Sequence, residues 1–423
     1  MGINRLFLEI IRILHYIIGS DYYCRRSTRR QMDFSRKGKV SFADYIYLIL
    51  HGIKKSLQPS LYEFFDAQGK FEMEYSKQAF SKGRKRIKPE AILELFQVVV
   101  REFYHRAALK DWHGYHLFGI DGTRLNLPCT KEVSEIYGTQ KSQGKPQVQA
   151  LVSCIYDLLN GIIVDFRISP CRSSERSQAD DMITAFDTKL IDNPVFIEDR
   201  GYPSAELIQT IEAAGYKYIM RCSTEFLRGM KLPADDNIFV HKFAKLKNSL
   251  TVRVVKIPLS ANRESEYLIT NLLDKDITLD DFKQLYHERW KIETLYDTIK
   301  NKLEIENFSG YLPDAILQDY YATLFLTNLV GVLEYDLSEE IEAAHANPEN
   351  KYKYEMNKSQ AISELRGKVV EMLYTRFKLK REILFHIMVI RLTKAVVPVR
   401  EDRHEPRENR HKSSKYSQNR KHI

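Results

Sequence analysis

Cysteine is scarce in this sequence of 423 residues. The five cysteines are scattered, and no two of them form a Cys-x2-Cys pair. The pattern argues against a disulfide framework and against a structural zinc site, because both need cysteines in closely spaced sets. It fits a reducing compartment. The five are Cys24, Cys129, Cys154, Cys171 and Cys222.

Long hydrophobic runs are also missing. The most apolar stretch, residues 320–333, falls short of the roughly 20 residues that cross a bilayer, and it contains Asn328. We expect a buried core helix there. The apolar start, residues 3–20, is interrupted by charged residues such as Arg5 and Arg12 at helical spacing. This favours an amphipathic helix over a signal peptide and predicts a soluble, cytoplasmic protein with no membrane partner.

Acidic residues are absent from residues 75–89, which hold six Lys or Arg. Such a cluster either contacts DNA phosphates or forms a solvated basic loop. We favour a DNA contact, because the net charge of +9 makes a polyanionic partner plausible. The candidate contacts within this segment are Lys82, Arg84, Lys85 and Arg86.

The apolar fraction of 43% and the aromatic fraction of 11% are typical of a folded globular protein. Apolar residues recur at helical spacing over residues 1–105, and strands alternate with helices over residues 106–215, which predicts an α/β core. A mostly β insertion (216–278), the rest of the core (279–335), a helical region (336–399) and a basic tail (400–423) follow.

Three acidic residues lie where a metal site would need them. Asp121 and Asp199 each follow a strand-like run, and Glu293 lies on a predicted helix. Carboxylates at strand ends and on a facing helix can converge on hard divalent cations, which prefer oxygen ligands. The alternative is that the two aspartates only cap or form turns.

The predicted helix over residues 285–303 carries four polar residues on one side. At 100° per residue, Tyr286, Arg289, Glu293 and Lys300 fall within roughly 60° of one another, beside an apolar stripe. The pattern indicates either a functional face or a solvated face with i,i+4 charge pairs.

These motifs resemble those of the insertion-sequence-4 family of bacterial DDE transposases. The Tyr-x2-Arg-x3-Glu-x6-Lys spacing matches that family's signature, and "DGT" at Asp121 and "DRGY" at Asp199 resemble the regions of its first two catalytic aspartates. The segment "SKQAFSKGRKRI" is similar to its N-terminal DNA-binding segment. The resemblance runs from about residue 75 to the basic tail.

The resemblance implies an α/β fold with an RNase H-like mixed-sheet core, flanked by helical regions. Asp121, Asp199 and Glu293 would be catalytic and would hold two Mg²⁺ ions, with Mn²⁺ as a substitute. The implied DNA contacts are Tyr286, Arg289 and Lys300, assisted by Arg200 and Tyr202.

The resemblance also implies the partners and the location: double-stranded DNA at the transposon ends and in the target, a homodimer in a synaptic complex, and the bacterial cytoplasm at the nucleoid. Two alternatives stay open. The protein could be an inactive or domesticated DNA-binding protein, or a nuclease without strand transfer. A hairpin step is also undecided, because Trp112 and Trp290 both lie outside the insertion.

Overall fold

The chain forms two units in the computed structural model, which describes residues 5–36, 38–54, 56–142, 145–258, 265–347 and 350–399. Unit 1 comprises Met1–Ala107, Asn126–Val148 and Thr298–Ile423, and unit 2 comprises Ala108–Leu125 and Gln149–Asp297. The predicted basic tail, residues 400–423, lies outside the described residues.

Most of unit 2 is a mixed sheet. In the described part of the chain, nine strands join it in the order β2-β3-β1-β5-β6-β9-β8-β7, with β4 paired to β3. The strands are β1 (His116–Leu127), β2 (Thr139–Ser142), β3 (Lys145–Asp157), β4 (Ile163–Pro170), β5 (Pro194–Glu198), β6 (Lys217–Cys222), β7 (Asp236–His241), β8 (Leu250–Ile257) and β9 (Glu266–Thr270). Strand β2 and the first residues of β3 belong to unit 1.

Strand direction divides the sheet into three parts. Strands β1, β5 and β6 are parallel, whereas β3 and β4 form an antiparallel pair joined through Asn160 and Gly161. Strands β6, β9, β8 and β7 are antiparallel, so residues 216–278 hold four strands that extend the same sheet. The predicted α/β class with a mixed sheet is confirmed, and the strand order is consistent with an RNase H-like core.

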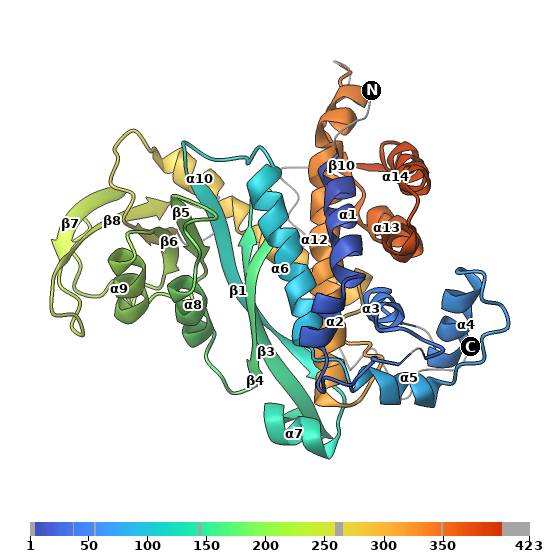
Figure 1. Ribbon diagram of the computed structural model, residues 1–423. Helices are drawn as coiled ribbons and strands as arrows, with labels where there is room; N and C mark the ends of the chain where they lie inside the picture. The colour runs from blue at the N-terminus through green and yellow to red at the C-terminus, as the bar shows by residue number, and fades with distance from the viewer. Residues whose placement is uncertain are drawn as a thin grey trace. The chain divides into compact units, whose positions relative to one another are not determined.

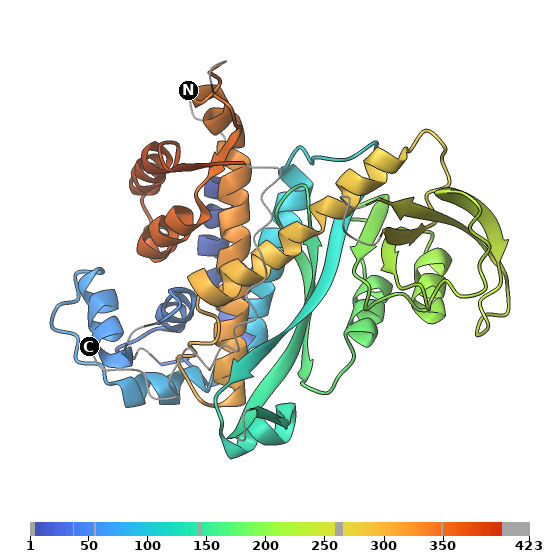
Figure 2. The ribbon, with the colours of Figure 1, turned by 180° about the vertical axis from the view of Figure 1, so that it is seen from behind.

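Helices cover both faces of this sheet. Helices α8 (Glu175–Thr184) and α9 (Ala205–Ala213) lie on one side, and α10 (Leu279–Glu288) and α11 (Trp290–Asp297) cross the other (Figures 1 and 2). Ser174 and Ser204 cap the first two by accepting backbone N–H groups, and a capping box starts α10.

Unit 1 is mostly helical, and its centre is α12 (Pro313–Ala344), which packs along α6 (Glu90–Arg106). The window of α12 that is apolar enough to cross a membrane is 83% buried inside the protein, as expected of a core helix. Around this pair lie α1 (Leu6–Ile18), α2 (Asp21–Ser27), α3 (Phe42–Leu50), α4 (Leu57–Asp66), α5 (Lys77–Arg84), α7 (Lys131–Tyr137), α13 (Lys358–Tyr374), α14 (Lys378–Leu392), and the short pair β10 (Tyr354–Met356) and β11 (Val396–Pro398).

Candidate active site

Three parallel strands of unit 2 lie side by side. Only β5 ends here, at Glu198, because β1 continues through Asp121 to Leu127, so the strand end expected at Asp121 is corrected. Ile120 on β1 lies opposite Glu198 on β5, and Glu198 lies opposite Met220 on β6. The next residues, Asp121, Asp199 and Arg221, therefore come in one row. Because neighbouring strands are about 4.8 Å apart and side chains alternate between faces, these three side chains start from the same face of the sheet.

Glu293 is held against the middle of β1 by its own helix. Gly119 leaves room for α11, since a Cβ added there would lie 3.6 Å from Cβ of Ile292. The Tyr296 hydroxyl also donates a hydrogen bond of 2.7 Å to the backbone carbonyl of Asp121. These two contacts place Glu293, one residue after Ile292, on the same face of the sheet as Asp121.

Arg289 lies between two of the acids. Its Nη2 donates to Oε1 of Glu293 at 2.8 Å and lies 4.0 Å from Oδ2 of Asp199, and its side chain is only 3% exposed. The Tyr286 hydroxyl donates to Oδ1 of Asp199 at 3.1 Å. Arg221 completes the network at 2.9 Å from the same Oδ1. Two guanidinium groups and a phenol thus hold Asp199.

The pKa values of the two aspartates, Asp121 and Asp199, are shifted in opposite directions. Burial raises the pKa of Asp121 to about 6, although the N–H of Gly122 and the charge of Arg289 oppose the rise. Burial also acts to raise the pKa of Asp199, but the N–H of Arg200, the two arginines and Tyr286 together bring it below its usual value. Asp199 is therefore ionised at neutral pH, and Asp121 titrates just below it.

Several buried polar groups at this site have no hydrogen-bond partner among the described residues. They include Nε and Nη1 of Arg289, the Tyr202 hydroxyl and both carboxylate oxygens of Glu198. Burial raises the pKa of Glu198 to about 8. Because buried polar groups in folded proteins are nearly always paired, these groups indicate room for a ligand or for water.

Metal binding can be judged by the donor chemistry. In the part of the chain that the structure describes, no group of three or more His, Cys, Asp or Glu side chains lies close enough to hold a metal ion. The three-acid pocket expected from the sequence is thus not closed, since Glu293 is bound to Arg289. The carboxylate oxygens of Asp121, Asp199 and Glu293 still suit a hard divalent cation, and their role as ligands stays a prediction.

Comparison with known proteins identifies the family of this chain. The family described as "Transposase DDE domain" matches residues 112–329, slightly more than half of the sequence. The chain belongs to this family of DDE-domain transposases. The matched range contains Asp121, Asp199 and the whole Tyr-Arg-Glu-Lys series.

Two individual proteins are also similar to this chain. The putative transposase InsZ of Escherichia coli (strain K12) is 28% identical over 167 residues, which are 38% of this chain and 51% of InsZ, so the chain spans about half of that relative. The piggyBac transposase, solved as a synaptic complex with hairpin DNA, has a TM-score of 0.48 and 10% identity over 92% of this chain and 86% of that one.

The signature segment differs from the single helix that the sequence predicts. Arg289 keeps helical backbone angles between α10 and α11, but Thr298–Lys302 is a π-helix, in which the Leu303 N–H bonds the Thr298 carbonyl. A π-turn shifts every later side chain away from the 100° phase. Lys300 lies in this π-helix, in unit 1, so it is not among the residues gathered in unit 2.

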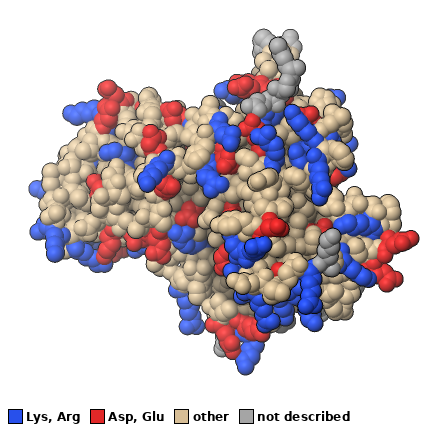
Figure 3. Space-filling view, viewed as in Figure 1, with Lys and Arg blue, Asp and Glu red and all other residues tan. Residues whose placement is uncertain are grey.

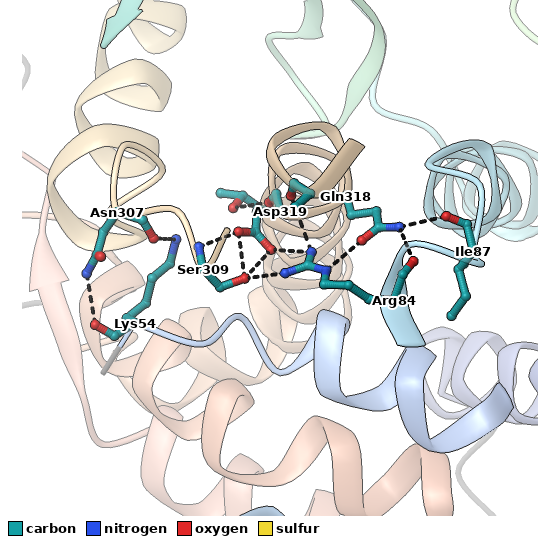
Figure 4. Close-up of polar contacts among 9 residues, drawn as sticks. Lys54, Arg84, Ile87, Asn307, Ser309, Gln318 and Asp319 are labelled. Carbon is teal, nitrogen blue, oxygen red and sulfur yellow. Dashed lines mark hydrogen bonds and ion pairs between the residues drawn. The ribbon is translucent and has the colours of Figure 1, made fainter. Parts of the chain in front are cut away.

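Four predicted DNA contacts are buried: Tyr202, Arg84, Tyr286 and Arg289. The Tyr286 hydroxyl is bonded to Asp199, and Arg289 keeps two nitrogens that have no partner among the described residues. The predictions for Tyr202 and Arg84 are corrected. Tyr202 is 1% exposed and lies in the interior of unit 2. Arg84 is 4% exposed and donates to Gln318 Oε1 (2.8 Å), Ser309 Oγ (2.6 Å) and Asp319 Oδ1 (3.0 Å), as Figure 4 shows. Its charge is neutralised inside unit 1, so Arg84 anchors α5 to α12. Arg200 is exposed, as a DNA contact requires.

The exposed basic surface is larger than the sequence predicts. Lys82, Lys85 and Arg86 are exposed. Residues 25–30, which the sequence analysis missed, join them because Thr28 bridges Ile87 and the Arg29 N–H bonds the Arg86 carbonyl at 2.9 Å. Lys and Arg side chains gather over this part of unit 1, around α2 and α5 (Figure 3). The added residues are Arg25, Arg26, Arg29 and Arg30, all exposed.

Two further site residues were also missed. Arg221 follows the run "YKYIM", so the same strand-end signal that found Asp121 and Asp199 was available for it. Tyr296 falls in the apolar stripe of the predicted helix over residues 285–303, and no sequence signal marks its bond to the Asp121 carbonyl.

Proposed function

We propose that this protein is an active DNA transposase of the insertion-sequence-4 type. It binds the terminal inverted repeats of an insertion sequence, cleaves at the ends by metal-dependent hydrolysis and joins the 3′-OH ends to target DNA. The main support is the placement of Asp121 and Asp199 in register, with Tyr296 tying the Glu293 helix to the same strand. These residues all lie inside the matched transposase domain.

Asp121, Asp199 and Glu293 would hold two Mg²⁺ ions, or Mn²⁺ in their place. When bound, such ions activate the attacking hydroxyl and stabilise the departing oxygen of the phosphodiester. The ionised state of Asp199 supports this role, because a carboxylate must be deprotonated to bind a metal.

Arg289 would bind a phosphate group of the DNA. Although Arg289 is only 2% exposed, its Nε and Nη1 have no acceptor among the residues that the structure describes. Guanidinium groups bind phosphate oxygens through paired N–H donors. Tyr286 and Arg221 orient Asp199 through the contacts described above. Lys300 and Arg200 stay proposed phosphate contacts.

The wider partners are proposals as well. The exposed basic surface around α2 and α5 would bind the DNA backbone of the transposon ends, where counterion release supplies affinity. A homodimer would join two ends in a synaptic complex in the bacterial cytoplasm.

The test uses the purified full chain and a DNA fragment that carries the element's own terminal inverted repeats. We expect strand nicking with Mg²⁺ or Mn²⁺ and joining of pre-cut ends to target DNA. The substitution Glu293→Gln abolishes nicking, whereas the control Glu288→Gln, whose side chain pairs with Lys291, leaves it unchanged.

The same experiment separates the alternatives. End binding without nicking under either metal would identify an inactive DNA-binding protein. Nicking without joining of pre-cut ends would identify a nuclease that lacks strand transfer.

A further inference from the structure

A fourth carboxylate lies beside Asp121. Glu175 is the first residue of α8, and its side chain passes directly over the backbone of Gly122. A Cβ added to Gly122 would lie only 2.8 Å from Cγ and 3.0 Å from Cδ of Glu175. The absence of a side chain at position 122 is therefore what lets Glu175 reach the residue next to Asp121.

The start of α8 is fixed on two sides. Arg176 donates from Nε to the carbonyl of Gly201 at 2.6 Å, in the loop that follows Asp199. Gln178 accepts from the Ser153 hydroxyl at 2.5 Å and donates to Ser169 at 2.9 Å. Glu175 is thus presented by a helix start that is bonded both to the Asp199 loop and to β3 and β4.

A buried hydroxyl group near this cluster is without a hydrogen-bond partner among the described residues. This hydroxyl belongs to Tyr202, which is 1% exposed. The carboxylates that act on it electrostatically are those of Asp121, Glu175 and Glu198. A cluster of anions with an unpaired buried hydroxyl is suited to a hydrated cation.

We propose that Glu175 is a fourth carboxylate of the metal pocket, on the side of Asp121. The inference rests on the proposed metal-dependent function. Asp121 and Glu175 together hold a divalent ion, whereas Glu293 serves the opposite side of Asp121 through the α11 helix. Divalent cations accept such a set readily, because each added carboxylate supplies one more hard oxygen donor and one more negative charge.

A purely structural role makes a different prediction. An acidic residue in the first turn of a helix is stabilised by the helix dipole whatever lies beside it. Replacing it by Gln would then change the stability slightly and leave metal affinity untouched.

The test is a titration of the full chain with Mn²⁺, followed by the paramagnetic resonance signal of the free ion and by calorimetry, without DNA. Glu175→Gln is compared with Glu132→Gln, the same change at an exposed residue in the first turn of α7. We expect Glu175→Gln to weaken Mn²⁺ binding about 10-fold, as loss of a group that supports a metal does. Glu132→Gln binds as the wild type does, and Glu175→Asp, which keeps the charge, recovers part of the loss.

Circular dichroism establishes that each variant is folded. If the wild type binds Mn²⁺ and nicks DNA while Glu175→Gln binds Mn²⁺ equally well, the inference is wrong and the proposed function stands. If the wild type neither binds Mn²⁺ nor nicks DNA, both are wrong.

Discussion

Arg289 donates to Glu293 at 2.8 Å while it lies 4.0 Å from Asp199, so one buried guanidinium joins two of the acids that the proposed chemistry needs. The arginine supplies the positive charge that a metal would otherwise provide. Burial disfavours its charge, but Tyr286, Asp199 and Glu293 more than restore it, so the pKa of Arg289 is raised. A metal ion that binds Glu293 must therefore share it with Arg289 or displace it.

The first prediction concerns a substitution that removes the positive charge of Arg289. Arg289→Gln leaves Asp199 and Glu293 without their buried partner and destabilises the metal-free protein at pH 7 by about 1–3 kcal/mol, less than a fully buried pair because both acids are partly exposed. The pKa of Asp199 is lowered in the folded state, so its contribution is present above the unfolded pKa and is lost as pH falls through the folded pKa. Urea denaturation at pH 7 and pH 3.5 should show the difference from wild type shrinking at the lower pH.

The second prediction concerns Asp121, whose pKa is raised to about 6 by burial. An acid with a raised pKa destabilises the fold above that pKa, and the effect vanishes below the unfolded pKa near 4. Asp121→Asn should therefore stabilise the metal-free protein on the order of 1–3 kcal/mol at pH 8 and hardly at all at pH 3.5. Denaturation in EDTA measures this, and equal stabilities at pH 8 would contradict it.

A third prediction separates two neighbours on the basic segment. Arg84→Gln breaks a buried network and should lower the free energy of unfolding by about 3–5 kcal/mol. Lys85→Gln, at an exposed position, should leave stability unchanged, weaken DNA binding and reduce the salt slope of binding by about one. Urea denaturation and DNA titrations at several salt concentrations measure both. The correction of Arg84 would be wrong if the Arg84→Gln protein kept its stability and bound DNA more weakly. Arg84 would then belong to the DNA-binding surface.

The fourth prediction tests the hydrogen bond between Tyr296, on the helix that carries Glu293, and the Asp121 carbonyl. Tyr296→Phe removes the donor to the Asp121 carbonyl, which costs about 1 kcal/mol of stability. Because the helix that carries Glu293 then loses one of its two ties to β1, nicking should slow while the affinity for end DNA stays the same. Single-turnover assays measure the nicking rate, and gel-shift titrations measure the affinity for end DNA. A change in affinity alone would assign Tyr296 to DNA binding.

Local pattern singled out Asp121 and Asp199, since each follows a short apolar run. Only Asp199 follows a strand end in the structure, because β1 continues through Asp121 to Leu127. The register that makes them direct neighbours depends on pairing between β1 and β5, which are far apart in sequence, so no local signal gives it. The pairing of β5 with β6 likewise brings Arg221 beside Asp199, although no motif around Arg221 in the sequence indicates a functional residue.

Burial of charge was the main failure of the sequence analysis. Arg84 stands in a basic run, and its partner Asp319 is 235 residues away, so its pairing could not be foreseen. The π-helix is equally hidden, because one residue of extra winding leaves the apolar pattern of residues 285–303 almost unchanged. Glu175 was missed because its position depends on Gly122, on another element, lacking a side chain.

Glu198 has a practical consequence for handling the protein. Its carboxyl group is buried with no hydrogen-bond partner in the described part of the chain, and it takes up a proton more readily than an ordinary glutamate, with a pKa of about 8. Alkaline buffers force a charge into the interior beside Asp199, whereas mildly acidic buffers leave this side chain neutral. Purification and storage near pH 6 should therefore spare this part of the molecule a strain that the customary buffers at pH 8 or above impose.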